Sequence, residues 1–92
     1  ATENGMSESL LVDPVRAFFR GRTGAYVEDL QSLINRAAAQ NAFIPQVAGD
    51  GIFGEATENA VKAVQAHEGL DVNGIVGPLT WQALLRLSGL SP

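Results

Sequence analysis

The chain contains no cysteine and a single histidine, so several classes of functional site are excluded at the outset. Without cysteine there are no disulfides, no thiolate metal ligands and no thiol nucleophile. The sequence also lacks the HExxH pattern of zinc peptidases and the GxSxG pattern of serine hydrolases. We therefore expect no catalytic residue, no metal and no cofactor, and we interpret His67 as a structural or solvated side chain.

Positive charge and long apolar runs are also scarce. Six Lys and Arg residues stand against ten Asp and Glu residues, which gives a formal net charge of −4. The whole acidic surplus lies in residues 26–92, a surface unsuited to displacing counterions from phosphates. A membrane helix needs about 20 mostly apolar residues, whereas unbroken aliphatic runs such as residues 10–12 and 37–39 have only three. We expect neither nucleic acid nor a membrane as a partner.

An internal repeat is the most informative feature that is present. Residues 50–61 align with residues 73–84 at an offset of 23, and five of the twelve aligned positions are identical. The identical positions are two glycines, an isoleucine, a threonine and an alanine. Two neighbouring matches of this kind indicate a duplicated structural unit.

Each copy of the repeat predicts a turn followed by a helix. Asp50-Gly51 and Asn73-Gly74 are strong turn dipeptides, because glycine accepts positive φ and the Asx side chain bonds nearby backbone. Two apolar residues follow, which we expect to anchor the turn on the core through short extended contacts at most. Pro78 suits the first position of a helix, and Thr57 and Thr80 fall in the first turn, where a hydroxyl can bond free backbone groups.

The periodicity of apolar residues predicts an all-α fold, a compact three-helix bundle. The helices are expected at about residues 26–40, 55–68 and 78–87, with apolar side chains spaced three and four apart. A shorter helix is predicted over residues 14–20, with Asp13 as its N-cap and Gly21 as its stop. We assign residues 1–22 to an N-terminal tail and short helix or linker, and residues 23–92 to the folded domain.

The spacing of these motifs resembles the peptidoglycan-binding-like domain, a small three-helix module of bacterial and phage cell-wall hydrolases. The resemblance covers about residues 25–87. It is carried by the following residues: Val27, Leu30, Gln31 and Leu33 or Ile34; Asp50, Gly51, Ile52, Phe53, Gly54, Thr57, Ala60, Val61 and Gln65; and Gly69, Leu70, Asn73, Gly74, Ile75, Val76, Gly77, Pro78, Thr80, Trp81, Ala83 and Leu84. The loop before Asp50 is several residues longer than is usual in the family.

The resemblance implies non-catalytic binding of peptidoglycan, through its glycan strand or its stem peptide. It further implies a catalytic domain on the same parent chain, a monomer, and a place in the cell envelope or outside the cell, including a phage lysis protein. An alternative is a protein-interaction or prodomain-like module of the same fold, although the absence of cysteine excludes a cysteine switch. A hydrolase in its own right is the third possibility, but a glycosidase needs two carboxylates across a cleft, and Asp50 is better explained as a turn cap.

Candidate ligand-binding residues are those that sugar or peptide recognition typically uses, namely aromatic rings and side-chain amides near the turns. They are Tyr26, Gln31, Asp50, Phe53, Gln65, Asn73 and Trp81. For Phe53 and Trp81 the competing interpretation is core packing, and for the two glutamines it is a bond to loop backbone. Because stem peptides carry free carboxylates, recognition on an acidic surface requires a local cation such as Arg36 or Lys62, or the group Arg16, Arg20 and Arg22.

Overall fold

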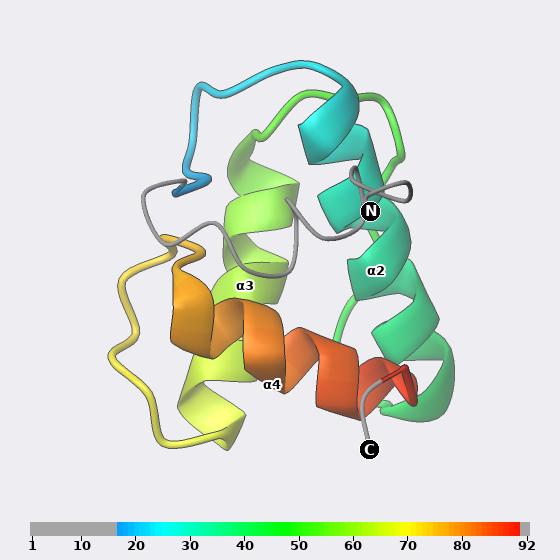
Figure 1. Cartoon of the computed structure of the whole chain (residues 1–92), viewed down its shortest axis with the longest axis vertical. Helices are drawn as coiled ribbons and strands as arrows, with labels where there is room; N and C mark the ends of the chain where they lie inside the picture. Colours follow the sequence, from blue (N-terminus) through cyan, green and yellow to red (C-terminus); the bar gives the residue numbers. More distant parts are fainter. Residues whose placement is uncertain (1–16, 91–92) are drawn as a thin grey trace, which may run out of the picture.

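The computed structural model describes residues 17–90 and forms three helices within them. They are α2 (Ala25–Gln40), α3 (Glu55–His67) and α4 (Pro78–Ser88). In Figure 1, α2 and α3 run roughly along the long axis of the molecule, and α4 lies across their lower halves. The all-α three-helix bundle predicted from the sequence is confirmed, and each predicted helix boundary lies within one residue of the observed one. No helix in this part of the chain is long and apolar enough to cross a membrane.

All three helices begin after a glycine, and none has a side-chain N-cap. Instead, the carbonyl oxygens of Gly24, Gly54 and Gly77 accept the first helical hydrogen bonds, at 3.0–3.1 Å. At the other end of α4, Gly89 adopts the left-handed conformation, with φ of 83°, and Leu90 N–H returns to Leu85 O. This is the glycine-ended geometry that satisfies the last carbonyls of a helix.

The core is built from the apolar faces that the periodicity predicted. Its buried members are Phe18, Val27, Leu30, Leu33, Ile34, Ala37, Ile44, Val47, Phe53, Ala60, Val61, Val64, Val76, Trp81, Ala83 and Leu84. Within each turn unit, one residue of the apolar pair enters this core and its neighbour faces solvent. Phe53 and Val76 are buried, whereas Ile52 and Ile75 are 55% and 43% exposed.

The predicted short helix over residues 14–20 is wrong for the part of it that the structure describes. Residues 17–20 are not helical, and residues 14–16 and the predicted N-cap Asp13 lie outside the described range. Phe18 is paired with Val76 by two backbone hydrogen bonds of 3.2 and 2.8 Å. Its ring is 2% exposed and meets Trp81 edge-on, with 5.7 Å between ring centroids. Pairing with a turn and burial in the core outweigh the local helical signals around Phe18.

The same N-terminal segment also pairs with the first turn. Phe53 N–H donates to Arg22 O, Gly21 N–H donates to Phe53 O, and Gly24 N–H donates to Gly51 O, each at 2.9 Å. Residues 18–24 therefore lie alongside both turn units and join them. Short extended contacts of the turns were expected, but their common partner, the segment before α2, was not.

The long loop between α2 and α3 is fixed by polar side chains as well as by its buried Ile44 and Val47. Asn35 both donates to Val47 O, at 2.8 Å, and accepts from Val47 N–H, at 2.7 Å. Phe43 stacks on His67, with ring centroids 3.8 Å apart and planes 9° apart, which ties the loop to the end of α3. The loop thus belongs to the folded body of the domain.

Phe18 tests whether the folded unit extends before residue 23. Phe18→Ala is expected to lower the free energy of unfolding by about 3–4 kcal/mol, because it removes a fully buried ring from a packed core. Phe19→Ala is the matched control, since that side chain is 43% exposed, and we expect a cost below about 1 kcal/mol. Urea denaturation followed by Trp81 fluorescence measures both. Equal effects of the two substitutions would contradict the placement of Phe18.

Candidate functional site

The second turn is organised around the buried side chain of Gln65. Its amide oxygen accepts the N–H groups of Asn73 and Gly74, at 3.1 and 2.9 Å. Its amide nitrogen lies within hydrogen-bond distance of the Asn73 side-chain oxygen, Ile75 O and Thr80 Oγ1, at 3.1, 3.0 and 3.2 Å. One side-chain amide therefore fixes the turn dipeptide, the residue after it and the first turn of α4.

Gln31 makes the equivalent arrangement in the first turn. Its oxygen accepts Gly51 N–H at 2.9 Å. Its nitrogen lies 3.2 Å from Asp50 Oδ1, 2.9 Å from Ile52 O and 3.1 Å from Thr57 Oγ1. Thr57 and Thr80 were expected to bond backbone, but the structure gives each of their hydroxyls a glutamine amide as hydrogen-bond donor. Both glutamine side chains are about 98% buried. Within residues 17–90, every buried side-chain nitrogen and oxygen atom has a hydrogen-bond partner.

The repeat is therefore longer than the twelve aligned residues, because each copy starts with the glutamine on the preceding helix. Gln65 precedes Asn73 by 8 residues, whereas Gln31 precedes Asp50 by 19. α2 continues for nine residues after Gln31, whereas α3 continues for two after Gln65. The loop before the turn is also longer, residues 41–49 against 68–72, so the glutamine is displaced in sequence but not in space. A signal for it exists in the sequence: Val27, Leu30 and Gln31 share their spacing with Val61, Val64 and Gln65.

Each turn also requires its glycine. Gly51 and Gly74 both have φ of +74°, a backbone conformation that residues other than glycine rarely adopt. A Cβ on Gly74 would lie 2.8 Å from Glu58 Cγ, and one on Gly51 would lie 3.1 Å from Glu28 Cγ. The turn backbone packs directly against the preceding helix, which explains why both copies contain the same glycine.

Two equivalent shallow pockets lie over the turns. The pocket of about 180 Å³ over the first turn includes Asp50, Ile52, Glu55 and Ala56, with Gln31 beneath. The pocket of about 220 Å³ over the second turn includes the matching Asn73, Ile75, Pro78 and Leu79, with Gln65 beneath. The glutamines and threonines are the same in both, while the rims differ. Asp50 and Glu55 make the first rim acidic. The second rim combines the Asn73 amide and the apolar Pro78 and Leu79 with one carboxylate, Asp71.

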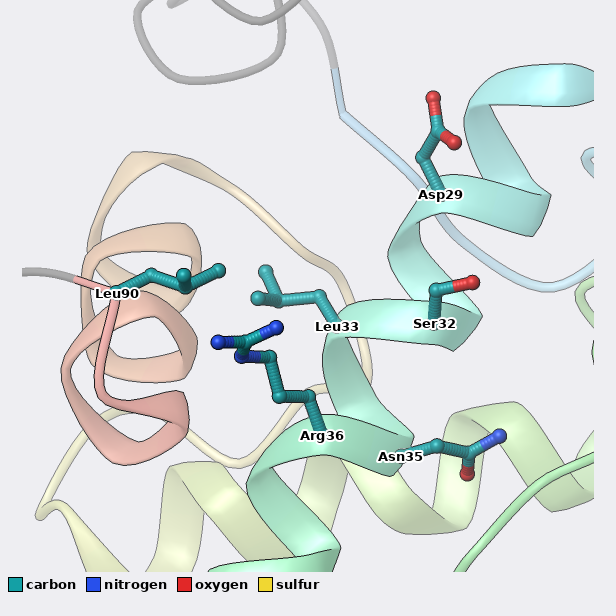
Figure 2. A pocket seen from close by; sticks show the side chains of 6 residues that line it. All are labelled: Asp29, Ser32, Leu33, Asn35, Arg36 and Leu90. Atoms are coloured by element: carbon teal, nitrogen blue, oxygen red, sulfur yellow. The ribbon is translucent and has the colours of Figure 1, made fainter.

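A larger groove, of about 560 Å³, lies between α2 and the end of α4 and is called the α2 groove below. Figure 2 shows its lining residues, Asp29, Ser32, Leu33, Asn35, Arg36 and Leu90. The side chains of Leu33 and Arg36 point toward Leu90, and Asp29 stands further along the same helix. Of these residues the sequence singled out only Arg36. The usable signal was the spacing of 29, 32, 33 and 36, which places them on one face of a helix.

The structure divides the predicted ligand-binding residues into three groups. Asp50 and Asn73 are exposed at the turns, and Gln31 and Gln65 lie beneath them as floors of the two pockets. Phe53 and Trp81 are 1% and 4% exposed in the core, in line with the competing core interpretation. Tyr26 is half-buried, with its ring centroid 6.5 Å from that of Phe18. The predicted residues therefore do not form one site, and their part in ligand binding stays a prediction.

Two carboxyl groups have pKa values below their ordinary range. For Asp50 the cause is first the hydrogen bond from Ile52 N–H and then the one from the Gln31 amide, both of which favour the ionised form. For Glu68 the causes are His67 and Arg86, which both contact its carboxylate. Asp50 thus acts as a turn cap that is ionised at neutral pH. Among residues 17–90, no three His, Asp or Glu side chains gather closely enough to bind a metal ion.

Comparisons with known proteins show which family the chain resembles in sequence. The sequence model of the family described as "Putative peptidoglycan binding domain" matches residues 23–84. The chain is 38% identical over 68 residues to the N-acetylmuramoyl-L-alanine amidase CwlL of Bacillus licheniformis. It is 35% identical over 65 residues to a probable N-acetylmuramoyl-L-alanine amidase of the same organism. These matches take in 74% and 71% of this chain, but only 18% of the length of each amidase.

Solved structures agree with the sequence matches. The SleB N-terminal domain superposes with a TM-score of 0.65 at 33% identity, covering 79% of this chain and 93% of that domain. A peptidoglycan-binding protein from Clostridioides difficile, solved in complex with glutamine hydroxamate, superposes with a TM-score of 0.69 at 32% identity. That superposition covers 87% of this chain and 48% of the other. The SleB match shows that a separate domain of nearly the same extent has this fold.

The buried glutamines generate a stability prediction. Gln65→Leu keeps the side-chain volume roughly constant but leaves the Asn73 and Gly74 N–H groups without their acceptor. We expect the free energy of unfolding to fall by about 2–4 kcal/mol, because buried donors lose their partners. Gln82→Leu, on the exposed face of α4, is the control and is expected to change stability by less than about 0.5 kcal/mol. Chemical denaturation of both variants measures the difference, and a Gln65→Leu protein as stable as the parent would refute the assignment.

Asp50 generates a pH prediction. Its folded pKa lies below the ordinary value of 3.8, so its ionised form stabilises the fold above about that pH. This contribution is lost as the pH falls through the folded pKa. Asp50→Asn is expected to keep the turn, since Asn73 accepts Ile75 N–H in the same way, at 2.9 Å. Its free energy of unfolding should then fall less steeply below pH 4 than that of the parent. Thermal denaturation between pH 2.5 and 7 tests this.

Asp71→Asn is the control for that titration. The Asp71 side chain is exposed and has no hydrogen bond to any other described residue, so this variant should follow the parent at acid pH. Some acid sensitivity should remain in Asp50→Asn because Glu68 also has a lowered pKa. Parallel curves for the parent and both variants would exclude Asp50 as a contributor.

Proposed function

Because the chain belongs to the peptidoglycan-binding domain family, we propose that it binds bacterial cell-wall peptidoglycan without cleaving it and targets an associated hydrolase to that polymer. The observation that carries the proposal is the extent of the family match. Residues 23–84 take in both turn units, both buried glutamines and most of α4. The matched region is thus the whole duplicated framework and not a single short motif.

The relatives support a role alongside an enzyme. The chain spans about a fifth of the length of the two amidases it matches, so most of each amidase lies outside the shared region. We infer that the activity of such proteins resides elsewhere in their chains and that this domain contributes attachment. On this proposal the protein works in the cell wall or outside the cell, as a monomer.

The predicted ligand-binding residues divide into three roles under this proposal. Because Asp50 and Asn73 are accessible at the rims of the turn pockets, we propose that these two residues touch the ligand. Gln31 and Gln65 act from below by fixing the backbone that presents those rims. The three aromatic residues support the fold: Phe53 and Trp81 are part of the core, and Tyr26 packs against it. Exposed Ile52 and Ile75 supply apolar surface beside each rim.

We further propose that the isolated domain binds weakly. Its pockets over the turns are small and shallow, and its net charge of −4 opposes stem-peptide carboxylates in bulk. Tethering to an enzyme raises the effective concentration at the wall, which compensates for modest affinity. Titration of the 92-residue chain with soluble muropeptides tests this, and binding below 1 µM would contradict it.

The decisive experiment is co-sedimentation of the chain with insoluble peptidoglycan sacculi. We expect the protein to pellet with sacculi, while the supernatant gains neither reducing sugar nor free amino groups. Bovine serum albumin and a cellulose pellet serve as controls for trapping. Release of fragments would contradict the proposal and indicate that the chain is itself a hydrolase. Absence of pelleting at several salt concentrations would favour a protein as the partner.

A further inference from the structure

The α2 groove reaches the usual size of a small-ligand site, and it is larger than either turn pocket. Its volume is about 560 Å³, whereas the two turn pockets measure about 220 and 180 Å³. Ligand sites in proteins are commonly about 300–1,000 Å³, with apolar walls and a few polar groups. Leu33 and Leu90 provide the apolar wall, and Asp29, Ser32 and Arg36 provide the polar groups.

Arg36 is the cation available in this groove. Its Nε donates to Ser88 O at 3.4 Å, and it forms no ion pair with any residue between 17 and 90. Arg20 and Arg86, by contrast, each pair with a glutamate. The contact with Ser88 O directs Arg36 toward Leu90, and Figure 2 shows its guanidinium in the space between α2 and the end of α4. A planar guanidinium held in this way suits a carboxylate ligand.

Asp29 supplies the opposite charge at a defined distance. It lies seven residues before Arg36 on α2, which at 1.5 Å per residue separates the two positions by about 10 Å on one helix face. Three residues of extended peptide span about the same length. Ser32 lies between them, and its side-chain hydroxyl makes no hydrogen bond to another described residue. Asn35 differs, because its amide is already occupied by Val47.

We propose that the α2 groove binds a short peptide that carries a free carboxylate and a free amine, with the carboxylate on Arg36 and the amine on Asp29. This rests on the proposed function and assigns the stem peptide of peptidoglycan, rather than the glycan strand, to this groove. Leu33 and Leu90 contact an aliphatic side chain of the peptide between the two charged ends. Charge complementarity is local here, so it operates despite the acidic balance of the whole chain.

The test uses Arg36→Gln with Lys62→Gln as the matched control. Both substitutions remove one positive charge, but Lys62 lies outside the groove, near Gly74. A soluble muropeptide with free carboxylates is titrated by calorimetry against the parent and each variant. We expect affinity to fall about three- to fivefold for Arg36→Gln, the size of a partly exposed charge-assisted contact, and to stay unchanged for Lys62→Gln. Equal affinity of the parent and Arg36→Gln overturns the proposal.

Modified ligands separate a direct contact from a structural effect of the substitution. The muropeptide with amidated carboxylates should bind the parent more weakly and should no longer distinguish Arg36→Gln from it. The muropeptide with acetylated amines should likewise no longer distinguish Asp29→Asn. Arg36→Lys keeps the charge and should retain part of the affinity even where thermal stability is reduced. Loss of binding that is the same for free and amidated ligands overturns the contact with Arg36.

Sacculi distinguish failure of this proposal from failure of the proposed function. If the parent pellets with sacculi and Arg36→Gln pellets equally, the domain binds peptidoglycan through another surface and the groove assignment is overturned. If the parent itself does not pellet, the proposed function fails and the groove assignment fails with it. Reduced pelleting of Arg36→Gln beside unchanged Lys62→Gln supports both.

Discussion

A buried glutamine amide in each turn unit is the interaction on which the rest of the structure depends. The amide satisfies backbone donors of the turn and sits against a carbonyl and a threonine hydroxyl of the helix that follows. Turn and helix start are therefore fixed by one side chain that belongs to the preceding helix. Since an unsatisfied buried polar group costs about 1–3 kcal/mol, the arrangement strongly favours a single geometry. The backbone of the exposed rims above Gln31 and Gln65 is therefore held in that one geometry.

This constraint explains which positions are identical in the two turn units and which differ. Positions that touch the amide are the same or chemically equivalent in both units, including the two glycines and the two threonines. Positions on the rim are free to differ, and they do: Glu55 and Ala56 in one unit correspond to Pro78 and Leu79 in the other. The fold thus presents two surfaces of unlike chemistry on one repeated support. Family membership accounts for the support, since the family match spans both units.

Most of the architecture was predictable from the sequence, because it is encoded in local signals. Apolar spacing, turn dipeptides and Pro78 were sufficient for three helices and their ends. The segment before α2 was not predictable, since the pairing of Phe18 with Val76 joins residues far apart in sequence and outweighs a plausible local helix. The site was harder still. Phe53 and Trp81 have the residue types of a sugar platform, but only tertiary packing reveals that they are buried, and only the return of Leu90 onto α2 creates the groove beside Arg36.

The carboxyl end of α4 has a consequence for how such a repeat can grow. Helix–turn units with open ends stack into solenoids of variable length. Here the last carbonyls of α4 accept hydrogen bonds from the end of α2 and its C-cap residue. Gln40 donates to Ser88 O at 2.7 Å, and Asn41 donates to Leu87 O at 2.8 Å. The carboxyl end of α4 is therefore closed by the end of α2, and a further unit packed on that end would have to displace these hydrogen bonds.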